Sequence, residues 1–232
     1  MVDITLPEPA KGFYYSDEPQ RSPWWIANRI GKIGASDLHR WMAVSKRDGK
    51  PRKARLDLER EIAFEKAFNT PFSMFTTAAM QEGIDNEAFV RSEYESQSGN
   101  KVQEVGCFYN DHFVASPDGL IGEDGGLEIK WLQDNSWSEV IATGKPYSGS
   151  SGDHNLQIQG NLYASGRKWW DYVAANPNTG RFIVIRVERD EDIIAGIAES
   201  VQDVKHVEPL KTEGVFEFST SIPVNEGDDI WS

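Results

Sequence analysis

Asp118, Glu128 and Lys130 lie in a short stretch of the chain that is rich in glycines and in aliphatic residues typical of buried strands. The stretch is SPDGLIGEDGGLEIKW, residues 116–131. An unpaired charge among aliphatic side chains costs several kcal/mol, so the fold has to satisfy these three groups together. Either they form a structural salt bridge, or they share something stronger, such as a metal ion.

The spacing of these residues predicts that they converge. Glu128 and Lys130 are two residues apart, so in a strand they point to one face while the apolar residues beside them point to the other. Gly125-Gly126 predicts a turn that brings Asp118 back beside this strand. Two carboxylates with a nearby carbonyl suit Mg²⁺ or Mn²⁺, and a lysine there can favour deprotonation of a bound water. The stretch therefore predicts a phosphodiester-hydrolysing site, although a cross-strand salt bridge explains the same spacing.

Composition limits the classes of protein that remain. A chain of 232 residues with 39% hydrophobic and 26% charged residues is an ordinary globular protein, and we expect one domain. No apolar run approaches the ~18–20 residues of a membrane span, and no signal peptide is recognisable, so no membrane contact is expected. The single Cys107 excludes an intramolecular disulfide and a cysteine zinc site, which favours the cytoplasm. The net charge of −13 disfavours non-specific nucleic-acid binding, but not an enzyme whose carboxylates bind metal ions.

Periodicity and turn signals predict an α/β domain that spans residues 1–232. Residues 1–22 are expected to form an N-terminal arm, and residues 208–232 an acidic tail. Ser36 is predicted to cap a helix, and Asn110-Asp111 to form a turn. Further helices are predicted over 56–68, 76–98, 135–143, 154–165 and 192–206, and strands within 102–131 and over 169–174 and 182–188. Helices packed around a mixed central β-sheet form such a domain.

Four blocks of the sequence resemble one family of nucleases. SPDGL followed by LEIK is similar to the PD-(D/E)xK nuclease core, and more narrowly to the phage lambda exonuclease, or YqaJ-type viral recombinase, family. WWIANRIGKIGASDL (24–38), GIDNEAF (83–89) and HNLQIQGNLY (154–163) resemble the other blocks of that family, in the same order. The resemblance implies a restriction-endonuclease-like core, with a mixed central sheet flanked by helices.

The resemblance also implies a set of metal ligands. Asp118, Glu128 and the carbonyl of Ile129 would bind Mg²⁺, for which Mn²⁺ would substitute. Glu87 would complete a second ion site or its water shell, so that the site holds two ions. Taken alone, Glu87 is equally well explained as a solvated glutamate on a helix face.

Two further side chains are implied to act on the attacking water. Lys130 would position and activate it, and Gln157 would orient the water or the scissile phosphate. Gln159 lies about 200° around the same predicted helix, so both glutamines cannot face the site. We expect Gln157 to do so.

A second pocket is implied for the terminal 5′-phosphate. Arg29, Ser36 and Ser116 match family positions that hold it. An arginine presents a fork of donors suited to phosphate, and a helix N-terminus adds backbone amides. The alternatives are a surface ion pair for Arg29 and a simple helix cap for Ser36.

Contacts to the duplex are predicted at two other places. Met80 falls where the family inserts an apolar wedge between base pairs, although a core methionine fits as well. The basic run from residue 45 to 55 contains Arg52, Lys53 and Arg55, which could grip the DNA backbone or remain solvated.

The function implied by the resemblance is a Mg²⁺-dependent 5′→3′ exonuclease on linear double-stranded DNA. It would leave a 3′ overhang for phage-type recombination in a bacterial host, as a ring-shaped homotrimer working with a single-strand annealing protein. An endonuclease or resolvase on the same core is the nearest alternative, and a non-catalytic DNA-end-binding protein is another. A paired-carboxylate hydrolase, as in glycosidases, leaves Lys130 and the four blocks unexplained.

Overall fold

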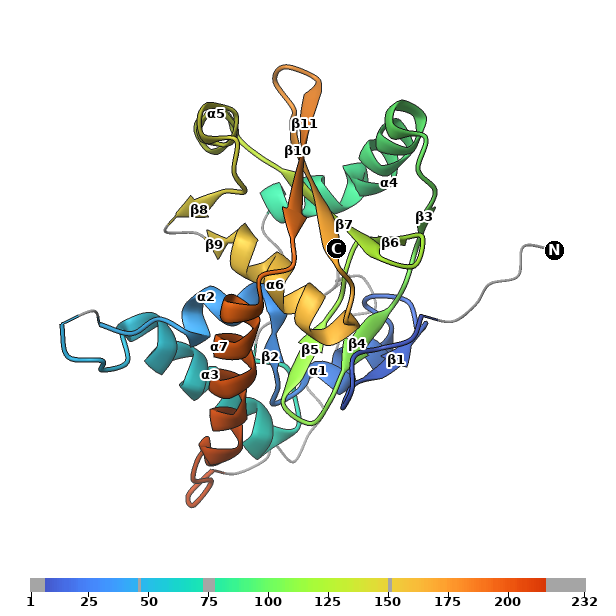
Figure 1. The fold of residues 1–232 in the computed structure, drawn as a ribbon. Coiled ribbons are helices and arrows are strands. Elements are labelled where there is room, and N and C mark those ends of the chain that lie inside the picture. The colour runs from blue at the N-terminus through green and yellow to red at the C-terminus, as the bar shows by residue number, and fades with distance from the viewer. Residues whose placement is uncertain (1–6, 46, 73–77, 150–151, 216–232) are drawn as a thin grey trace, which may run out of the picture.

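The computed structural model describes residues 7–45, 47–72, 78–149 and 152–215 (Figure 1). The helices of this part of the chain are α1 Pro23–Arg29, α2 Leu38–Trp41, α3 Lys53–Phe68, α4 Ala78–Ser98, α5 Asp134–Thr143, α6 His154–Ser165 and α7 Glu191–Val201, with 3-10 helices η1 Ala35–Asp37 and η2 Gln202–His206. The strands are β1 Tyr14–Ser16, β2 Ile33–Gly34, β3 Val102–Gln103, β4 Cys107–Tyr109, β5 Phe113–Ala115, β6 Gly119–Ile121, β7 Gly125–Trp131, β8 Ser148–Gly149, β9 Gly152–Asp153, β10 Trp169–Asn176 and β11 Arg181–Glu188.

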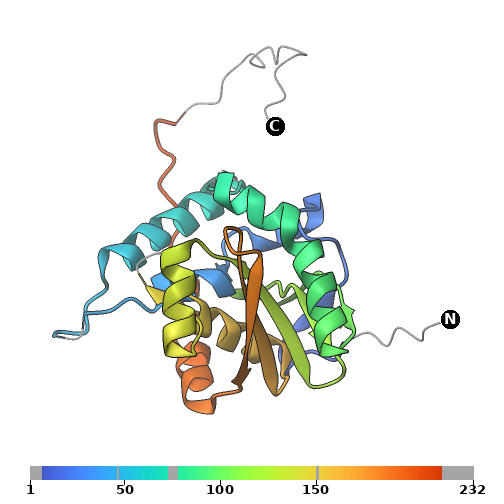
Figure 2. The ribbon, with the colours of Figure 1, turned by 90° about the horizontal axis from the view of Figure 1, so that it is seen from above.

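The central sheet has five strands in the order β11-β10-β7-β6-β3. Strand β10 runs parallel to β7 and places Tyr172 opposite Glu128, whereas β6 runs antiparallel to β7. The predicted mixed sheet is therefore confirmed. A second sheet, β1-β4-β5-β2, and the pair β8-β9 complete the β structure of the described residues. Helices α4 and α5 lie on opposite sides of the β10–β11 hairpin (Figure 2).

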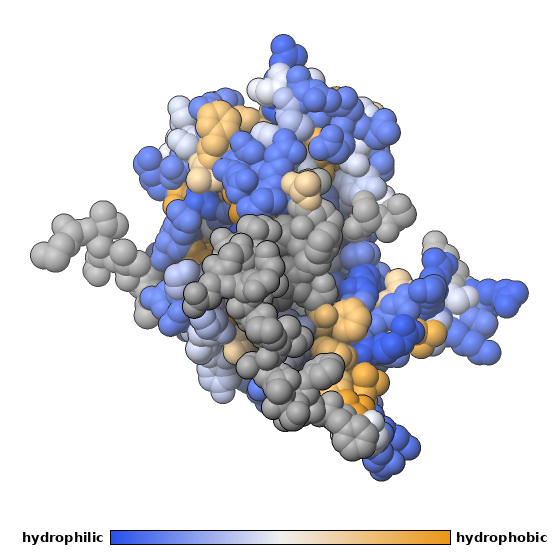
Figure 3. Space-filling model, turned by 180° about the vertical axis from the view of Figure 1, so that it is seen from behind, coloured by the Kyte–Doolittle hydropathy of each residue, from blue (hydrophilic) through white to orange (hydrophobic). Residues whose placement is uncertain are grey.

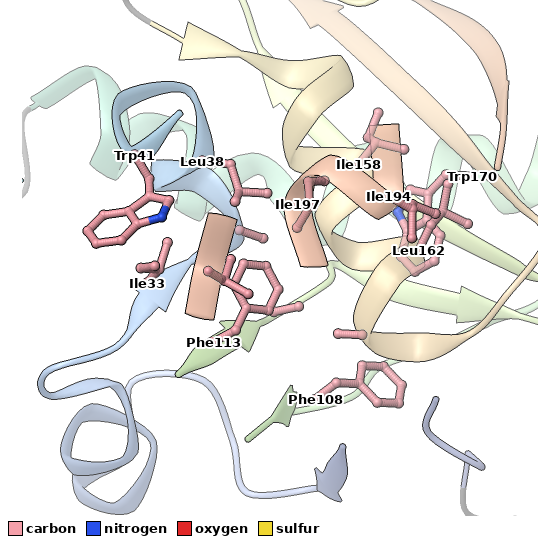
Figure 4. Close-up of a cluster of buried hydrophobic side chains, with 14 of the residues drawn as sticks. Ile33, Leu38, Trp41, Phe108, Phe113, Ile158, Leu162, Trp170, Ile194 and Ile197 are labelled. Carbon is pink, nitrogen blue, oxygen red and sulfur yellow. The ribbon is translucent and has the colours of Figure 1, made fainter. Parts of the chain in front are cut away.

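Strand β10 separates two apolar layers by the alternation of its side chains. Trp170 and Tyr172 belong to the main core, while Val173 and Ala175 pack with Val90 of α4 on the other face. Figure 4 shows how the main core is assembled from α2, α6 and α7 together with β2, β4 and β5. Because β7 follows the same alternation, its charged residues share the face covered by α6.

Several predicted elements are confirmed with small shifts at their ends. Helix α6 spans the predicted residues 154–165, and the strand pair 107–109 and 113–115 is joined at the predicted turn. There Asn110 Oδ1 accepts hydrogen bonds from two backbone N–H groups. Helix α3 begins three residues earlier than predicted, and the helix predicted over 192–206 ends as the 3-10 helix η2.

The turn predicted at Gly125-Gly126 is wrong, because both residues lie within β7 and the turn spans residues 122–124. A Cβ added at Gly125 would lie 2.2 Å from the ring of Trp169, and one at Gly126 would lie 2.3 Å from the ring of Trp170. Glycine at these two positions leaves room for the side chains of two tryptophans on the neighbouring strand.

The predicted helix cap at Ser36 is also wrong. Ser36 lies inside η1, whose N-cap is Gly34, and Asp37 precedes α2 without a side-chain capping bond. The helical segment therefore begins at Ala35, and Ser36 lies in its first turn rather than before it.

Much of the expected N-terminal arm is built into the domain. Strand β1 pairs with β4, and Phe13 is 7% exposed in the main core. Residues 1–6 and 216–232 lie outside the described residues, and residues 208–215 follow η2 as an exposed segment. The described surface facing the viewer in Figure 3 is mostly hydrophilic, with apolar residues in small groups. None of the described helices is both long and apolar enough to span a membrane.

Candidate active site

Glu128 is the centre of the charged cluster on β7. Its side chain is 1% exposed and accepts three hydrogen bonds. Lys130 Nζ and Gln157 Nε2 each lie 2.6 Å from Oε1, and Asn161 Nδ2 lies 2.9 Å from Oε2. The strand supplies the lysine and α6 supplies the two amides. The fold therefore satisfies a buried carboxylate with one cation and two neutral donors.

Asp118 lies beside Glu128, immediately before β6. Its Oδ2 accepts a 2.7 Å hydrogen bond from the backbone N–H of Ile129. Burial, and then the charge of Glu128, raise the pKa of Asp118 to about 7, against the opposing effect of Lys130. Burial also opposes protonation of Lys130, but Glu128 and Asp118 outweigh it and raise the lysine's pKa. The positive charge of one lysine therefore does not neutralise the two carboxylates.

Glu87 approaches the same place from α4. It forms a 2.5 Å ion pair with Arg91, which also pairs with Glu104 at 2.7 Å. Burial, followed by the charge of Asp118, raises the pKa of Glu87 to about 7. Glu87, Arg91, Asp118 and Arg21 line a cavity of about 360 Å³, which we call the metal-site cavity.

Asp118 and Glu87 of this cavity, together with the adjacent Glu128 of β7, form a donor set that fits Mg²⁺ or Mn²⁺. Among the described residues, no three Asp, Glu, His or Cys side chains already converge as a ligand cluster. The two buried carboxylates nevertheless carry excess negative charge and offer hard oxygen donors, which these ions prefer. Asp118, Glu128 and the Ile129 carbonyl are the groups that would hold the ion, with Glu87 available for a second one.

The raised pKa values of Asp118 and Glu87 predict how metal-free stability varies with pH. Their ordinary values are 3.8 and 4.5, and both are raised to about 7 in the folded protein. Between these values the folded state binds more protons than the unfolded state, so stability falls as the pH rises through this window. Mg²⁺ binds the ionised carboxylates, so it should raise the thermal midpoint more at about pH 8 than at about pH 5.5.

Asp118→Asn tests the same expectation, because it keeps an acceptor for the Ile129 N–H but removes the charge. At about pH 8 without metal, its thermal midpoint should exceed that of the wild type by about 3–8 °C, and its response to Mg²⁺ should be lost. Asp124→Asn is the matched control, since Asp124 pairs with Lys168 on the surface. An undiminished Mg²⁺ response in Asp118→Asn would contradict the metal assignment.

Helix α6 presents one polar face to the site. Gln157 faces Glu128 as predicted, whereas Gln159 points away and bonds the Glu188 carbonyl and the Asp190 N–H, at 2.8 and 3.0 Å. Gln157 is therefore the glutamine at the site, and its role there stays a prediction.

Two residues of the same face were missed in the sequence. Asn161 follows Gln157 by four residues, so helical spacing was the available signal. His154 Nδ1 lies 2.8 Å from the hydroxyl of Tyr172. Burial, and then the charge of Lys130, lower the pKa of His154 to about 3, which keeps its ring neutral at physiological pH.

The three residues predicted to bind the 5′-phosphate also come together. The Arg29 guanidinium stacks 4.5 Å from the ring centroid of Trp25, and Trp25 Nε1 donates a 2.9 Å hydrogen bond to Ser116 Oγ. A Cβ added at Gly34 would lie 2.9 Å from Arg29 Nη2 and 3.5 Å from Ser36 Oγ. Trp25, which the sequence did not single out, links the arginine to Ser116.

Arg29 lines a second cavity of about 510 Å³, the Arg29 cavity, together with Arg21, Trp25, Lys32 and Arg40. Arg40 is neutralised there by Glu61 at 2.6 Å. Within the described part of the chain Arg29 forms no such ion pair, and burial lowers its pKa although Asp37 opposes this effect. A poorly solvated cation without a carboxylate partner is suited to an anionic ligand.

The predicted DNA contacts outside these cavities differ in their surroundings. Arg55 stacks 3.3 Å from the ring centroid of Trp41 and donates a 2.6 Å hydrogen bond to its carbonyl, so the fold holds it in place. Arg52 and Lys53 are exposed, and Lys53 pairs with Asp57. The side chain of Met80 lies outside what the structure describes. DNA contact stays a prediction for all four predicted residues.

The fold and the site are those of a restriction-endonuclease-like α/β protein with a buried Asp–Glu–Lys site on its mixed sheet. The chain belongs to the YqaJ-like viral recombinase family, whose domain profile matches residues 24–168. Both the predicted fold and the predicted family are thereby confirmed.

Solved structures place the fold among exonucleases. An alkaline exonuclease, LHK-Exo, from Laribacter hongkongensis is 31% identical, with a TM-score of 0.69 over 80% of this chain and 91% of that chain. Its complex with dAMP gives a TM-score of 0.68 at the same identity and coverage. A phage-related exonuclease from Haemophilus somnus 129PT shares the fold, with 15% identity and a TM-score of 0.58 over 76% of this chain and 92% of that chain. No curated protein matches the sequence.

Proposed function

We propose that the protein is a Mg²⁺-dependent nuclease that degrades one strand of linear duplex DNA from its 5′ end. The observation that carries the proposal is the convergence of Lys130 and Gln157 on Glu128, beside Asp118. Membership of a viral recombinase family supports it, as does the 31% identity to a protein described as an alkaline exonuclease. That relative was also solved with dAMP, a mononucleotide of the kind an exonuclease releases.

The chemistry follows from what each side chain can do. A bound divalent cation would supply a water of lowered pKa and would stabilise charge on the phosphate. Lys130 has a raised pKa and stays protonated, so it acts as a charged hydrogen-bond donor that orients the water and stabilises its deprotonated form. Gln157 presents an amide to the same carboxylate oxygen of Glu128 and would orient the water or the phosphate.

The arrangement of the two cavities supports the proposed direction of degradation. Arg21 lines both of them, so they adjoin. A terminal phosphate held by Arg29, Ser36 and Ser116 would place the next phosphodiester at the metal site. Such an arrangement would release a 5′-nucleotide and leave a growing 3′ overhang.

The biological setting we propose is phage-type recombination in the cytoplasm of a bacterial host. A 3′ overhang is the substrate of a single-strand annealing protein, which is the proposed partner. A homotrimeric ring around the duplex would let a few basic groups line its channel despite the net charge of −13. The proposed assembly is supported by the family alone.

End-labelled duplexes test the proposal. With Mg²⁺, the strand that carries the 5′-phosphate should shorten from that end, and EDTA should stop the reaction. Nicking of closed circular plasmid would instead indicate an endonuclease or a resolvase. Binding of duplex ends without degradation would indicate an end-binding protein.

Arg29→Ala should remove the preference for a phosphorylated end. Charge-assisted hydrogen bonds are worth ~1.5–3 kcal/mol each, so the wild type should degrade 5′-phosphorylated duplex roughly ten- to several-hundred-fold faster than 5′-hydroxyl duplex. The variant should slow only the phosphorylated substrate and keep its Mg²⁺ dependence. Initial rates on the two matched duplexes measure this. Equal rates for the wild type would make Arg29 a structural residue.

A further inference from the structure

Arg21 has a backbone conformation that arginine rarely adopts. Its φ is +70°, in the left-handed region where an L side chain crowds its own backbone. It is the third residue of a turn closed by a 3.1 Å hydrogen bond from Ser22 N to Pro19 O. Glycine or asparagine is favoured at that position, because φ is positive there and not at the preceding Gln20. A glycine would be less strained, so the reason for an arginine lies in its side chain.

Both neighbours of Arg21 are anchored beside the two cavities. Gln20 Nε2 donates a 3.0 Å hydrogen bond to the carbonyl of Pro117, which directly precedes the first proposed metal ligand. Ser22 Oγ accepts a 3.2 Å hydrogen bond from the N–H of Trp25 and so caps α1, the helix that ends at the proposed phosphate-binding arginine. The turn therefore holds Arg21 between the metal site and the Arg29 cavity.

Among the described residues, Arg21 alone lines both cavities. The other cation of the metal-site cavity, Arg91, is neutralised by Glu87 and Glu104. Arg21 is exposed and, within the described ranges, forms no ion pair with the carboxylates around it. Its charge acts to lower the pKa of Glu87, but no described carboxylate lies within ion-pair distance of its guanidinium, which can therefore bind an anion at the boundary between the two cavities.

We propose that Arg21 binds the phosphodiester between the first and second nucleotides of the degraded strand. A strand whose 5′-phosphate lies at Arg29 and whose next phosphate lies at Asp118 has to cross this boundary. The guanidinium fork matches the paired oxygens of a phosphate. This inference rests on the proposed function and adds a residue that holds the scissile phosphate independently of the terminal one.

Arg21→Gly is the sharpest test, because it removes the guanidinium and relieves the backbone at the same time. Single-turnover release of the first nucleotide should slow about ten- to hundredfold on both 5′-phosphorylated and 5′-hydroxyl duplex, since the scissile phosphate is present in both. The thermal midpoint should stay equal or rise. Arg21→Lys keeps the charge without the fork and should recover part of the rate. Arg181→Ala removes an exposed arginine that lines neither cavity, and should behave as the wild type.

Three results would overturn the inference and leave the proposed function standing. A wild-type rate in Arg21→Gly would show that the side chain does not touch the scissile phosphate. A lowered thermal midpoint in both Arg21→Gly and Arg21→Asn, with a rate lost in proportion, would make Arg21 structural. A slower rate on phosphorylated duplex alone would assign it to the terminal phosphate. A wild type that degrades no DNA would overturn the proposed function itself, and the role of Arg21 with it.

Discussion

Asp118→Ala and Glu128→Gln should each reduce Mg²⁺-dependent DNA degradation to background. Each change removes one of the two buried carboxylates that the cation would need, and the neighbouring groups offer no replacement in the same position. Saturating Mg²⁺ should therefore not rescue either variant. Degradation of linear duplex over a range of Mg²⁺ concentrations measures this. A rate of degradation close to that of the wild type in either variant would contradict the proposed metal ligands.

The choice of substitution at Glu128 matters for folding. Glu128→Ala would leave Lys130, Gln157 and Asn161 without their common acceptor in a buried site. Removing one partner of a buried ion pair typically costs about 3–5 kcal/mol, so this variant should lose stability as well as activity. Glu128→Gln keeps the shape and one acceptor oxygen. Thermal midpoints measured beside the rates separate loss of the metal ligand from loss of the fold.

Lys130→Ala should slow catalysis by roughly 10²–10⁴-fold while DNA binding and Mg²⁺ binding persist. The lysine is one of three donors to Glu128, and the two amides of α6 remain in the variant. The fold should therefore survive, with a lower thermal midpoint because Glu128 loses its cation, whereas the charged donor that orients the attacking water is lost. Single-turnover rate and thermal midpoint are measured on the same preparation.

Lys168→Ala is the matched control for that experiment. Lys168 forms a surface ion pair with Asp124 at 3.0 Å, and its side chain is 71% exposed. Removal of such a pair changes stability little and should leave the rate unaltered. If Lys130 were only a salt-bridge partner, its variant would lose stability while the folded fraction kept a normal rate. That outcome would contradict the proposed mechanism.

The sequence predicted those parts of the site that depend on local spacing. Glu128 and Lys130 share a face because a strand alternates its side chains, and helical geometry allowed only one of Gln157 and Gln159 to face them. The helix predicted over residues 154–165 has the same bounds in the structure.

Local rules gave the wrong conformation at two places. Gly125-Gly126 looks like a turn, but Trp169 and Trp170 of the adjacent strand need the space that a Cβ would take. Ser36 looks like a helix cap, but the chain enters that helix through a 3-10 turn. At Gly125-Gly126 tertiary packing overrode an ordinary local preference.

What the sequence by itself determined is the order of the four blocks, and with it the family, the class of fold and the identity of the charged residues. Only the tertiary structure decided which groups meet. Asn161 bonds a carboxylate 33 residues away, and Trp25 bonds a serine 91 residues away. Arg21 reaches two cavities from one strained turn. These long-range contacts form because the apolar faces of distant segments pack together and are removed from water. Which faces pack depends on the whole chain and cannot be read from any short stretch of it.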